Sequence, residues 1–116
     1  MVTKFKNIEF LPKDGKRLKL VSAEGVFDPN TTTELLISAA KRTVSKSTKV
    51  LDLGCGTGVV GLSLWLDGLA KEPIYASDLS EPSVSCSREN FKKYECKADV
   101  RCGALFDPWK NEKFDV

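Results

Sequence analysis

The amino-acid sequence predicts an α/β fold in which an N-terminal β-hairpin precedes a partial parallel sheet with flanking helices. Three observations support this prediction. From residue 49 onward, short apolar runs alternate with segments of helical spacing, which is typical of β-α-β units. A glycine-rich turn over 54–58 joins the first of these runs to a helical segment. Near the N-terminus, two runs with partial alternation of apolar and polar residues flank a turn-forming stretch.

The hairpin is predicted from residues 5–10 (FKNIEF) and 18–26 (LKLVSAEGV), which flank the turn residues 12–15 (PKDG). Its exposed positions are rich in basic side chains: Lys4, Lys6, Lys13, Lys16, Arg17 and Lys19. Such a face is either an ordinary solvated surface or a docking arm for an acidic partner or nucleic acid. We assign residues 1–27 to this extension and residues 28–116 to the domain that carries the chemistry.

The elements of the main domain follow in order. Asn30 and the threonines after it predict a helix N-cap, and Leu35, Leu36, Ala39 and Ala40 recur at helical spacing, so we expect a helix over 32–44. The further elements are strands over 49–53, 73–77 and 98–102, helices over 59–66 and from residue 80 or 81, and the start of a fourth strand at 113–116.

Residues 50–62 (VLDLGCGTGVVGL) form the clearest motif of the chain. Residues 56–61 formally match the G-x-G-x-x-G pattern of dinucleotide sites. A second pattern overlaps it, in which Asp52 precedes Gly54, Gly56 and Gly58. Glycines at a strand-to-helix turn permit positive φ and close approach of a ligand, and the helix N-terminus adds a positive dipole end. Both patterns use these features, so the glycines alone do not identify the ligand. The charge of the residues around the loop is therefore the feature that separates the two interpretations.

Asp52 stands at the end of its predicted strand, two residues before the first glycine. A carboxylate there would repel a pyrophosphate, whereas it attracts the sulfonium and ammonium groups of S-adenosylmethionine. Two unit charges about 4 Å apart interact by roughly 4 kcal/mol at an effective dielectric constant near 20. The sign of this interaction favours S-adenosylmethionine. Asp52 could also cap backbone amides of the glycine turn, alone or in addition.

Asp78 ends the next predicted strand, at about the 20-residue offset where an acid holds ribose hydroxyls in nucleotide-binding sheets. A carboxylate can accept hydrogen bonds from both hydroxyls. The alternative for Asp78 is a helix-capping role before the segment that starts at Ser80.

The composition of the chain excludes several kinds of catalytic and binding site. The chain has no histidine, which removes Ser-His and Cys-His nucleophile pairs. The four cysteines show no C-x-x-C spacing, so we expect no metal site and reduced thiols in a cytoplasmic protein. The net charge of +2 is too small to indicate a nucleic-acid partner by itself. No apolar run reaches the roughly 20 residues of a membrane helix, and we expect no membrane association.

The segment 52–58 (DLGCGTG) resembles the D/E-x-G-x-G-x-G motif of class I S-adenosylmethionine-dependent methyltransferases, and Asp78-Leu79 resembles the acidic motif after their second strand. The resemblance implies a Rossmann-like fold with S-adenosylmethionine as cofactor. It places Asp78 on the ribose and Leu79 on the adenine. The residues it places beside the methionine part are Asp52, Gly54, Cys55, Gly56 and Gly58.

Residues 29–36 (PNTTTELL) are similar to the P-R-P-E-T-E-L-L segment of HemK-like glutamine methyltransferases. Residues 25–27 (GVF) resemble a segment of the "methyltransferase small" domains that modify ribosomal RNA. In these families the region borders the cofactor, which adds Thr33 to the candidate site. The alternative for Thr33 is an ordinary helix N-terminus. This finer resemblance implies a nitrogen acceptor in protein or RNA.

Two departures from the family pattern are visible. Family members often carry G-D-L-F after the third strand, whereas this chain reads GALFD at 103–107. Ala104 therefore occupies the acid's place, and only backbone groups and Leu105 could meet the adenine unless Asp107 substitutes. The family's N-P-P-Y acceptor motif does not occur in the sequence. We therefore name no catalytic residue.

We expect the chain to be the N-terminal part of a larger methyltransferase, truncated at the fourth strand. It should be inactive alone, with a dimer or partner covering the sheet edge. Two alternatives remain open at this stage. One is a non-catalytic methyltransferase-like module that binds a partner through the basic hairpin. The other is a nicotinamide-binding Rossmann domain, against which Asp52 argues.

Overall fold

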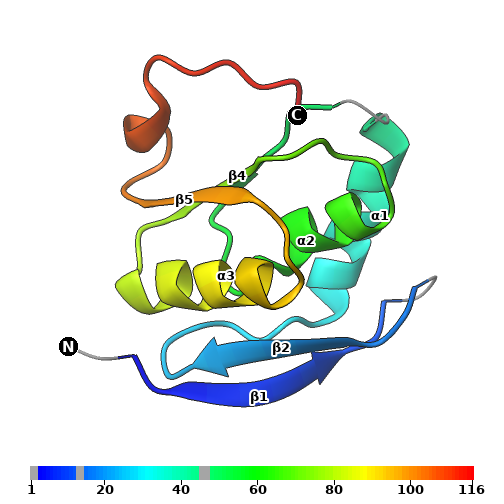
Figure 1. Ribbon diagram of the computed structural model, residues 1–116, viewed down its shortest axis with the longest axis vertical. Coiled ribbons are helices and arrows are strands. Elements are labelled where there is room, and N and C mark those ends of the chain that lie inside the picture. Colours follow the sequence, from blue (N-terminus) through cyan, green and yellow to red (C-terminus); the bar gives the residue numbers. More distant parts are fainter. Residues whose placement is uncertain (1–2, 13–14, 45–47) are drawn as a thin grey trace.

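The computed structural model describes residues 3–12, 15–44 and 48–116. Its elements in chain order are β1 (Phe5–Phe10), β2 (Leu18–Ala23), α1 (Thr31–Thr43), β3 (Leu51–Leu53), α2 (Val59–Leu66), β4 (Ile74–Asp78), α3 (Glu81–Lys93), β5 (Ala98–Cys102) and the 3-10 helix η1 (Asp107–Trp109). Figure 1 shows this order in colour.

The strands form two sheets. β1 and β2 pair antiparallel as a hairpin, with Phe10 opposite Leu18 beside the turn. β3, β4 and β5 form a parallel sheet in that order, with Asp52 opposite Ala76 and Asp78 opposite Cys102. The predicted α/β fold and the preceding hairpin are therefore confirmed. The turn residues Lys13 and Asp14 lie outside the described residues.

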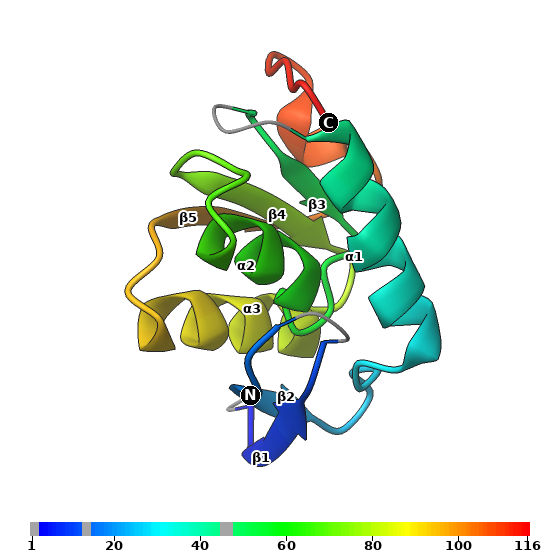
Figure 2. The same ribbon diagram turned by 90° about the vertical axis from the view of Figure 1, so that its right-hand side faces the viewer.

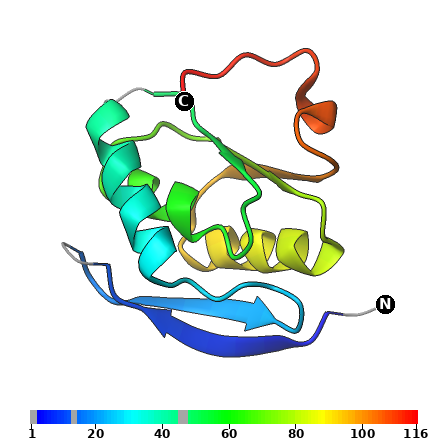
Figure 3. The same ribbon diagram turned by 180° about the vertical axis from the view of Figure 1, so that it is seen from behind.

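The elements stack in layers. Helices α2 and α3 lie against one face of the parallel sheet, and the hairpin lies on the side of α3 that faces away from the sheet (Figures 1 and 2). α1 stands beside α2, at the side of the sheet where β3 runs (Figures 2 and 3). The segment after β5 passes over the opposite face of the sheet (Figure 1). α3 is thus enclosed between the sheet and the hairpin.

The core fills the space between the sheet and these helices. Ile74 of β4, Leu62 of α2 and Phe91 of α3 are each at most 2% exposed. Leu20 of the hairpin is fully buried in the same cluster, so the hairpin and the sheet share one core. Gly61 lets α2 approach β4 closely, because a Cβ there would lie 2.9 Å from the Ile74 Cγ2 atom. The boundary between residues 27 and 28 stays a prediction.

The predicted helical stripe of α1 is mostly solvent-exposed. Only Ile37 of this helix is buried, whereas Leu35 and Leu36 are 66% and 54% exposed. The spacing predicted the helix correctly, but it did not predict which face of the helix packs against the core. Leu66, the last residue of α2, is also exposed.

Three differences from the sequence prediction exceed one residue. β2 ends at Ala23, because the Val26 amide donates to the Ala23 carbonyl and Gly25 takes a φ of +82° in the resulting turn. β3 is shorter than expected, covering three residues. Residues 113–116 form no regular strand, although the Leu51 amide donates to the Val116 carbonyl at 2.8 Å beside β3.

An aromatic cluster covers the sheet face opposite the helices. The rings of Tyr75, Trp109 and Phe114 meet edge to face, with centroids 5.2 to 5.7 Å apart. The Arg101 guanidinium lies 4.2 Å from the Trp109 ring centroid and donates to the Pro108 carbonyl. These contacts stabilise η1, an element that the sequence analysis did not predict.

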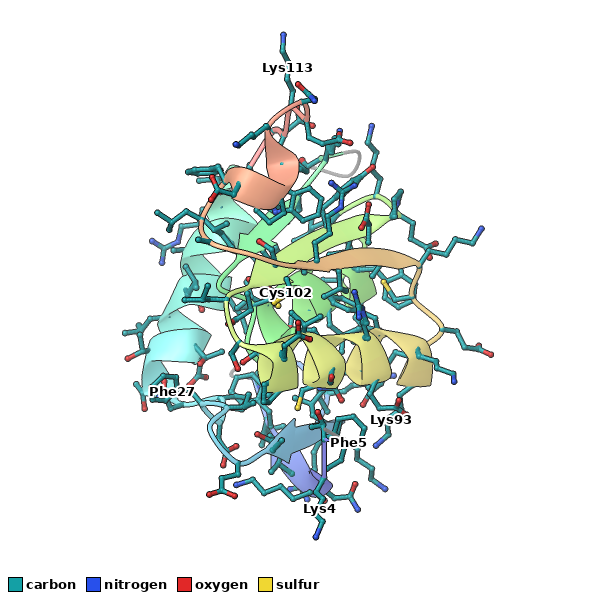
Figure 4. The ribbon with its side chains drawn as sticks, turned by 90° about the vertical axis from the view of Figure 1, so that its left-hand side faces the viewer. Lys4, Phe5, Phe27, Lys93, Cys102 and Lys113 are labelled. Atoms are coloured by element: carbon teal, nitrogen blue, oxygen red, sulfur yellow. The ribbon has the colours of Figure 1, made fainter. Side chains whose placement is uncertain are left out.

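Part of the basic hairpin surface is neutralised within the chain. Arg17 pairs with Glu9 at 3.1 Å and Lys6 pairs with Asp28 at 3.5 Å. Lys4 projects from the hairpin away from the sheet (Figure 4). Across the described ranges, no helix combines the length and the apolar character needed to cross a membrane.

Candidate functional site

A cavity of about 600 Å³ opens at the carboxyl ends of β3 and β4. Its lining comes from three segments that are far apart in sequence: residues 25–36 before and within α1, residues 52–60 around the glycine turn, and residues 78–83 at the start of α3. In an open parallel sheet, ligands bind outside the carboxyl ends of the strands. The glycine turn therefore lies where the fold places a ligand.

The glycine loop turns one side to the cavity and the other to α3. Gly54, Gly56 and Gly58 have φ values of +72°, +53° and +82°, which L-residues rarely adopt. A Cβ at Gly54 or Gly56 would meet nothing within 4 Å, whereas one at Gly58 would lie 3.0 Å from the Phe91 Cε2 atom. Gly58 does not line the cavity. It provides the close contact that anchors the loop on α3.

The amides of the loop already have partners on β4. Gly54 and Cys55 both donate to the Ser77 carbonyl at 2.9 Å. The Gly56 amide donates to the Asp78 Oδ2 atom at 3.0 Å. A phosphate-binding loop needs such amides free to face the anion, because they supply most of its hydrogen bonds. Here three successive amides are bonded within the protein.

Asp52 is a buried carboxylate at the base of the cavity. Its Oδ2 atom accepts a hydrogen bond from the Gly61 amide at 3.2 Å, so it does cap a backbone amide near the start of α2. Burial raises the pKa of Asp52 from 3.8 to about 6, the Gly61 bond lowers it, and the negative charge of Asp78 raises it. A cationic ligand group beside Asp52 would offset the cost of keeping this carboxylate ionised.

Asp78 holds the end of β4 to the loop after β3. Its Oδ2 atom accepts from Gly56 and its Oδ1 atom accepts from the Ser80 amide at 2.9 Å. Ser80, not Asp78, is the N-cap residue of α3. An ionised carboxylate has about four acceptor sites, so each oxygen of Asp78 can accept a further hydrogen bond from a ligand.

The charged side chains that line the cavity are all acidic. They are Asp28, Asp52 and Asp78, of which Asp28 pairs with Lys6 at 3.5 Å, and no lysine or arginine is found among the described residues of the lining. The cavity therefore favours a ligand with positive charge at its polar end. The structure thus adds Asp28 to Asp52 and Asp78, the two acids that the sequence indicated.

Thr33 both takes part in the helix cap and lines the cavity. Its backbone amide donates to the Asn30 side chain at 3.2 Å, and its Oγ1 atom accepts from the Asn30 amide at 3.1 Å. This is a reciprocal capping box at the start of α1, and the same residue lines the cavity. Phe27, which is 92% exposed, also lines the cavity. It lies near the N-terminal end of α1 (Figure 4).

A second, smaller hollow of about 220 Å³ adjoins the loop on its β5 side. Gly54 and Asp78 line both hollows, and the small one also contains Leu79, Ala104 and Leu105. Leu79 and Leu105 are each 73% exposed, so both can cover a flat apolar ligand group. Asp107 lines neither hollow.

Cys55 is inert as a nucleophile. Its Sγ atom lies 2.9 Å from the Ser87 Oγ atom, and burial raises the pKa of its thiol from 9.0 to about 12. The thiol is thus protonated at physiological pH and reactive thiolate is scarce. Within the described ranges, no three histidine, cysteine or acidic side chains cluster closely enough to hold a metal ion.

Three groups that lie at the loop or the cavity were not predicted from the sequence. Asp28 lines the cavity, and Ser87 and Asn90 of α3 bond to carbonyls of the loop. Ser87 and Asn90 are three residues apart in a helix. This spacing predicts only that the two side chains lie on the same face of the helix. Which element that face would contact was not readable from the sequence.

The comparisons with known proteins agree with this geometry. The family model of the methyltransferase small domain matches residues 17–116. A ribosomal protein L11 methyltransferase of Staphylococcus saprophyticus is 33% identical over 87 residues, which cover 73% of this chain and 27% of that protein. A release factor glutamine methyltransferase of Dictyoglomus turgidum is 32% identical over 106 residues, covering 84% of this chain and 36% of that protein.

Solved structures show the same fold. The 16S rRNA N2 G1207 methyltransferase of T. thermophilus, in complex with AdoMet and guanosine, has a TM-score of 0.75 at 19% identity. The match covers 92% of this chain and 30% of that one. The ribosomal protein L11 methylase of Lactobacillus delbrueckii has a TM-score of 0.63 at 22% identity, over 71% and 42% of the two chains.

This chain spans roughly a quarter to a third of the length of the curated relatives it matches. The family model nevertheless covers β2 and every later element, including the glycine loop and both hollows. The chain therefore belongs to the methyltransferase small domain family.

Proposed function

We propose that this chain is the S-adenosylmethionine-binding part of a methyltransferase. The acidic cavity at the glycine loop is the observation that carries the proposal, because Asp52 and Asp78 line it with no basic residue among the described lining. S-adenosylmethionine presents a sulfonium and an ammonium group, both positive. The relatives support the same ligand, since the T. thermophilus structure is a complex with AdoMet.

The residues present fit this cofactor. Gly54 and Gly56 leave open space toward the cavity, since a Cβ at either position would meet no atom within 4 Å. Asp52 would face the positive groups of the methionine part, with Cys55 and Thr33 beside it. Asp78 would accept hydrogen bonds from the ribose hydroxyls. Leu79, Ala104 and Leu105 would cover the adenine in the smaller hollow.

The geometry argues against a nicotinamide dinucleotide. Its pyrophosphate needs free backbone amides, but those of Gly54, Cys55 and Gly56 are bonded to Ser77 and Asp78. The buried carboxylate of Asp52 would in addition repel a pyrophosphate. The match to G-x-G-x-x-G at residues 56–61 thus reflects the close packing of Gly61 on β4.

The cofactor would supply a methyl group activated by the positive charge of its sulfur. The chain's own contribution is to hold that donor rigidly, because a methyl transfer needs donor and acceptor in a near-attack geometry. The hydrogen bonds from the loop to β4 provide this rigidity. We assign no catalytic residue, because none of the described side chains stands out as an acceptor-side base.

For the acceptor, we propose a nitrogen atom in a protein or in RNA. Support comes from the relatives named above, which act on ribosomal protein L11, on a release factor glutamine and on N2 of a guanine in 16S rRNA. We also propose a cytoplasmic location, which is supported by four cysteines that all remain free thiols.

Calorimetric titration tests the cofactor proposal. S-adenosylhomocysteine should bind the 116-residue chain, and NAD⁺ should not. Gly54→Ala should weaken binding by at least tenfold, because its Cβ would enter the space of the ligand. Gly68→Ala is the matched control, since both glycines have a φ of +72° and neither Cβ would meet a protein atom within 4 Å.

A folded chain that binds NAD⁺ as tightly as S-adenosylhomocysteine would contradict the proposal. So would equal binding by the Gly54→Ala and Gly68→Ala variants, because the backbone cost of the two changes is the same. Binding of neither cofactor would leave the alternative of a non-catalytic module.

A further inference from the structure

The side chain of Asn90, on α3, bonds to the hairpin and to the glycine loop at the same time. Its Oδ1 atom accepts from the Val21 amide at 2.7 Å. Its Nδ2 atom donates to the Val21 carbonyl at 2.9 Å and to the Thr57 carbonyl at 2.8 Å. Asn90 is fully buried, so these bonds form away from water. One side chain therefore connects β2 with the loop that lines the cavity.

On the hairpin side, Asn90 makes the backbone hydrogen bonds to Val21 that a neighbouring strand would otherwise make. Both backbone groups of Val21 face α3 rather than β1, and Asn90 satisfies both. Two residues earlier on the same edge, the Lys19 amide donates to the Tyr94 hydroxyl at 2.8 Å. Residues two apart on a strand present their backbone groups to the same edge. Asn90 of α3 and Tyr94, the C-cap residue of α3, thus cover this edge of β2, and of these two side chains only Asn90 also bonds to the loop.

On the loop side, α3 holds two successive carbonyls. The Ser87 hydroxyl donates to the Gly56 carbonyl at 2.7 Å, and Asn90 donates to the Thr57 carbonyl. The two side chains lie one helical turn apart on the same face. With its carbonyls held on α3, the loop directs the Gly56 amide to Asp78. The position of Asn90 therefore affects the backbone that forms the cavity wall.

We propose that Asn90 is a positioning residue that couples the hairpin to the cofactor loop, so that hairpin docking strengthens cofactor binding. This inference rests on the proposed function. Coupling between two sites is reciprocal, so cofactor binding must in turn stabilise the docked hairpin. A purely structural asparagine would satisfy the same buried groups and lower stability when replaced, but it would not link the two sites.

The first experiment compares the affinities of two folded variants for S-adenosylhomocysteine. Asn90→Asp keeps the size and the acceptor for the Val21 amide, but it turns a carboxylate oxygen toward two carbonyls. Tyr94→Phe removes the other hydrogen bond between α3 and β2 and leaves the loop untouched. We expect Asn90→Asp to raise the dissociation constant at least tenfold and Tyr94→Phe to change it less than threefold. Equal affinity in folded Asn90→Asp and wild type would overturn the proposal.

The second experiment measures hydrogen exchange of individual amides in the wild-type chain. Adding S-adenosylhomocysteine should slow exchange of the Val21 amide at least threefold, although Val21 does not line the cavity. Unchanged exchange at Val21 in the ligand-bound chain would overturn the coupling. This arm needs no variant, so it decides the question even if Asn90→Asp fails to fold.

If the chain binds no S-adenosylhomocysteine, the proposed function is refuted. The coupling between the hairpin and the loop can still be tested by hydrogen exchange without ligand. In the absence of ligand, Asn90→Asp should speed exchange of both the Val21 amide and the Gly58 amide, which donates to the Cys55 carbonyl within the loop. Tyr94→Phe should speed exchange at Lys19 only. Faster exchange at Val21 with an unchanged Gly58 would show that the hairpin and the loop move independently, and would overturn the inference.

Discussion

The carboxylate of Asp78 accepts a hydrogen bond from the Gly56 amide at 3.0 Å, which ties the end of β4 to the loop that follows β3. The same carboxylate also accepts from the Ser80 amide before α3. One acid at a strand end therefore joins three parts of the cavity wall, and it keeps acceptor sites for a ligand.

The first prediction concerns this acid. Asp78→Asn should weaken binding of S-adenosylhomocysteine by roughly tenfold to a hundredfold, because hydrogen bonds to charged groups contribute about 1.5–3 kcal/mol. Isothermal titration calorimetry measures the change. Asp107→Asn is the matched control, because Asp107 lines neither hollow and should bind within twofold of wild type. The assignment of Asp78 is wrong if both variants bind as the wild type does.

The second prediction concerns the stability of the ligand-free chain against pH. Burial raises the pKa of Asp52 to about 6, above the 3.8 of an exposed aspartate. The folded state therefore holds this proton more tightly than the unfolded state. The resulting stabilisation is fully present below about pH 4 and is lost as pH rises through about 6.

Asp52→Asn should abolish this loss of stability at high pH. A neutral amide carries no desolvation penalty for charge, and its oxygen can still accept a hydrogen bond from the Gly61 amide. We expect the variant to exceed the wild type in unfolding free energy by about 1–3 kcal/mol at pH 8, with little difference at pH 4. Urea unfolding at the two pH values checks this. Cofactor affinity should fall in the same variant. A difference that is equally large at pH 4 would indicate a packing effect instead.

The third prediction concerns the anchor of the glycine loop. Gly58→Ala should destabilise the chain by about 2–4 kcal/mol, as the sum of a positive-φ cost near 1–2 kcal/mol and a packing cost of similar size. The packing cost arises because the Cβ would lie 3.0 Å from the Phe91 Cε2 atom and 3.3 Å from the Ser87 Cα atom. Gly68→Ala, with a φ of +72° and open surroundings, should show only the backbone cost. Similar chemical denaturation midpoints for the two variants would show that the loop can move away from α3.

The fourth prediction concerns the far side of the sheet. The Trp109 Nε1 atom donates to the Ser77 hydroxyl at 2.9 Å, and both residues are buried. A double-mutant cycle with Trp109→Phe and Ser77→Ala should give a coupling energy of about 1 kcal/mol in unfolding experiments. Trp109 should also fluoresce at shorter wavelength than Trp65, which is less buried. Additive effects of the two substitutions would show that the hydrogen bond adds no stability.

Local sequence was sufficient for much of the fold. The Asn30 cap, the glycine turn and the apolar runs each act over a few residues, so the helices and strands could be predicted with boundaries close to those observed. The candidate site could be predicted for a related reason. In a parallel sheet, residues at the carboxyl ends of successive strands come together, and this brought Asp52, Gly54, Gly56 and Asp78 to one cavity, whereas Gly58 packs on α3 instead.

Other features depended on contacts between distant segments. The helical stripe of α1 did not show that Leu35 and Leu36 stay exposed, because spacing predicts a shared face but not its partner. Likewise, η1 is stabilised by Tyr75 and Arg101, which no local pattern connects to residues 107–109.

The sequence by itself determined the strand–turn–helix order, the glycine loop and the two acids at the strand ends, because these follow from backbone preferences and short-range spacing. Only the tertiary structure decided which side of the loop is open, that its amides are bonded to β4, and that Asn90 joins the loop to the hairpin. Each of these depends on where α3 packs. That position results from burying α3 between the sheet and the hairpin, a balance of contacts over the whole chain that no single segment encodes.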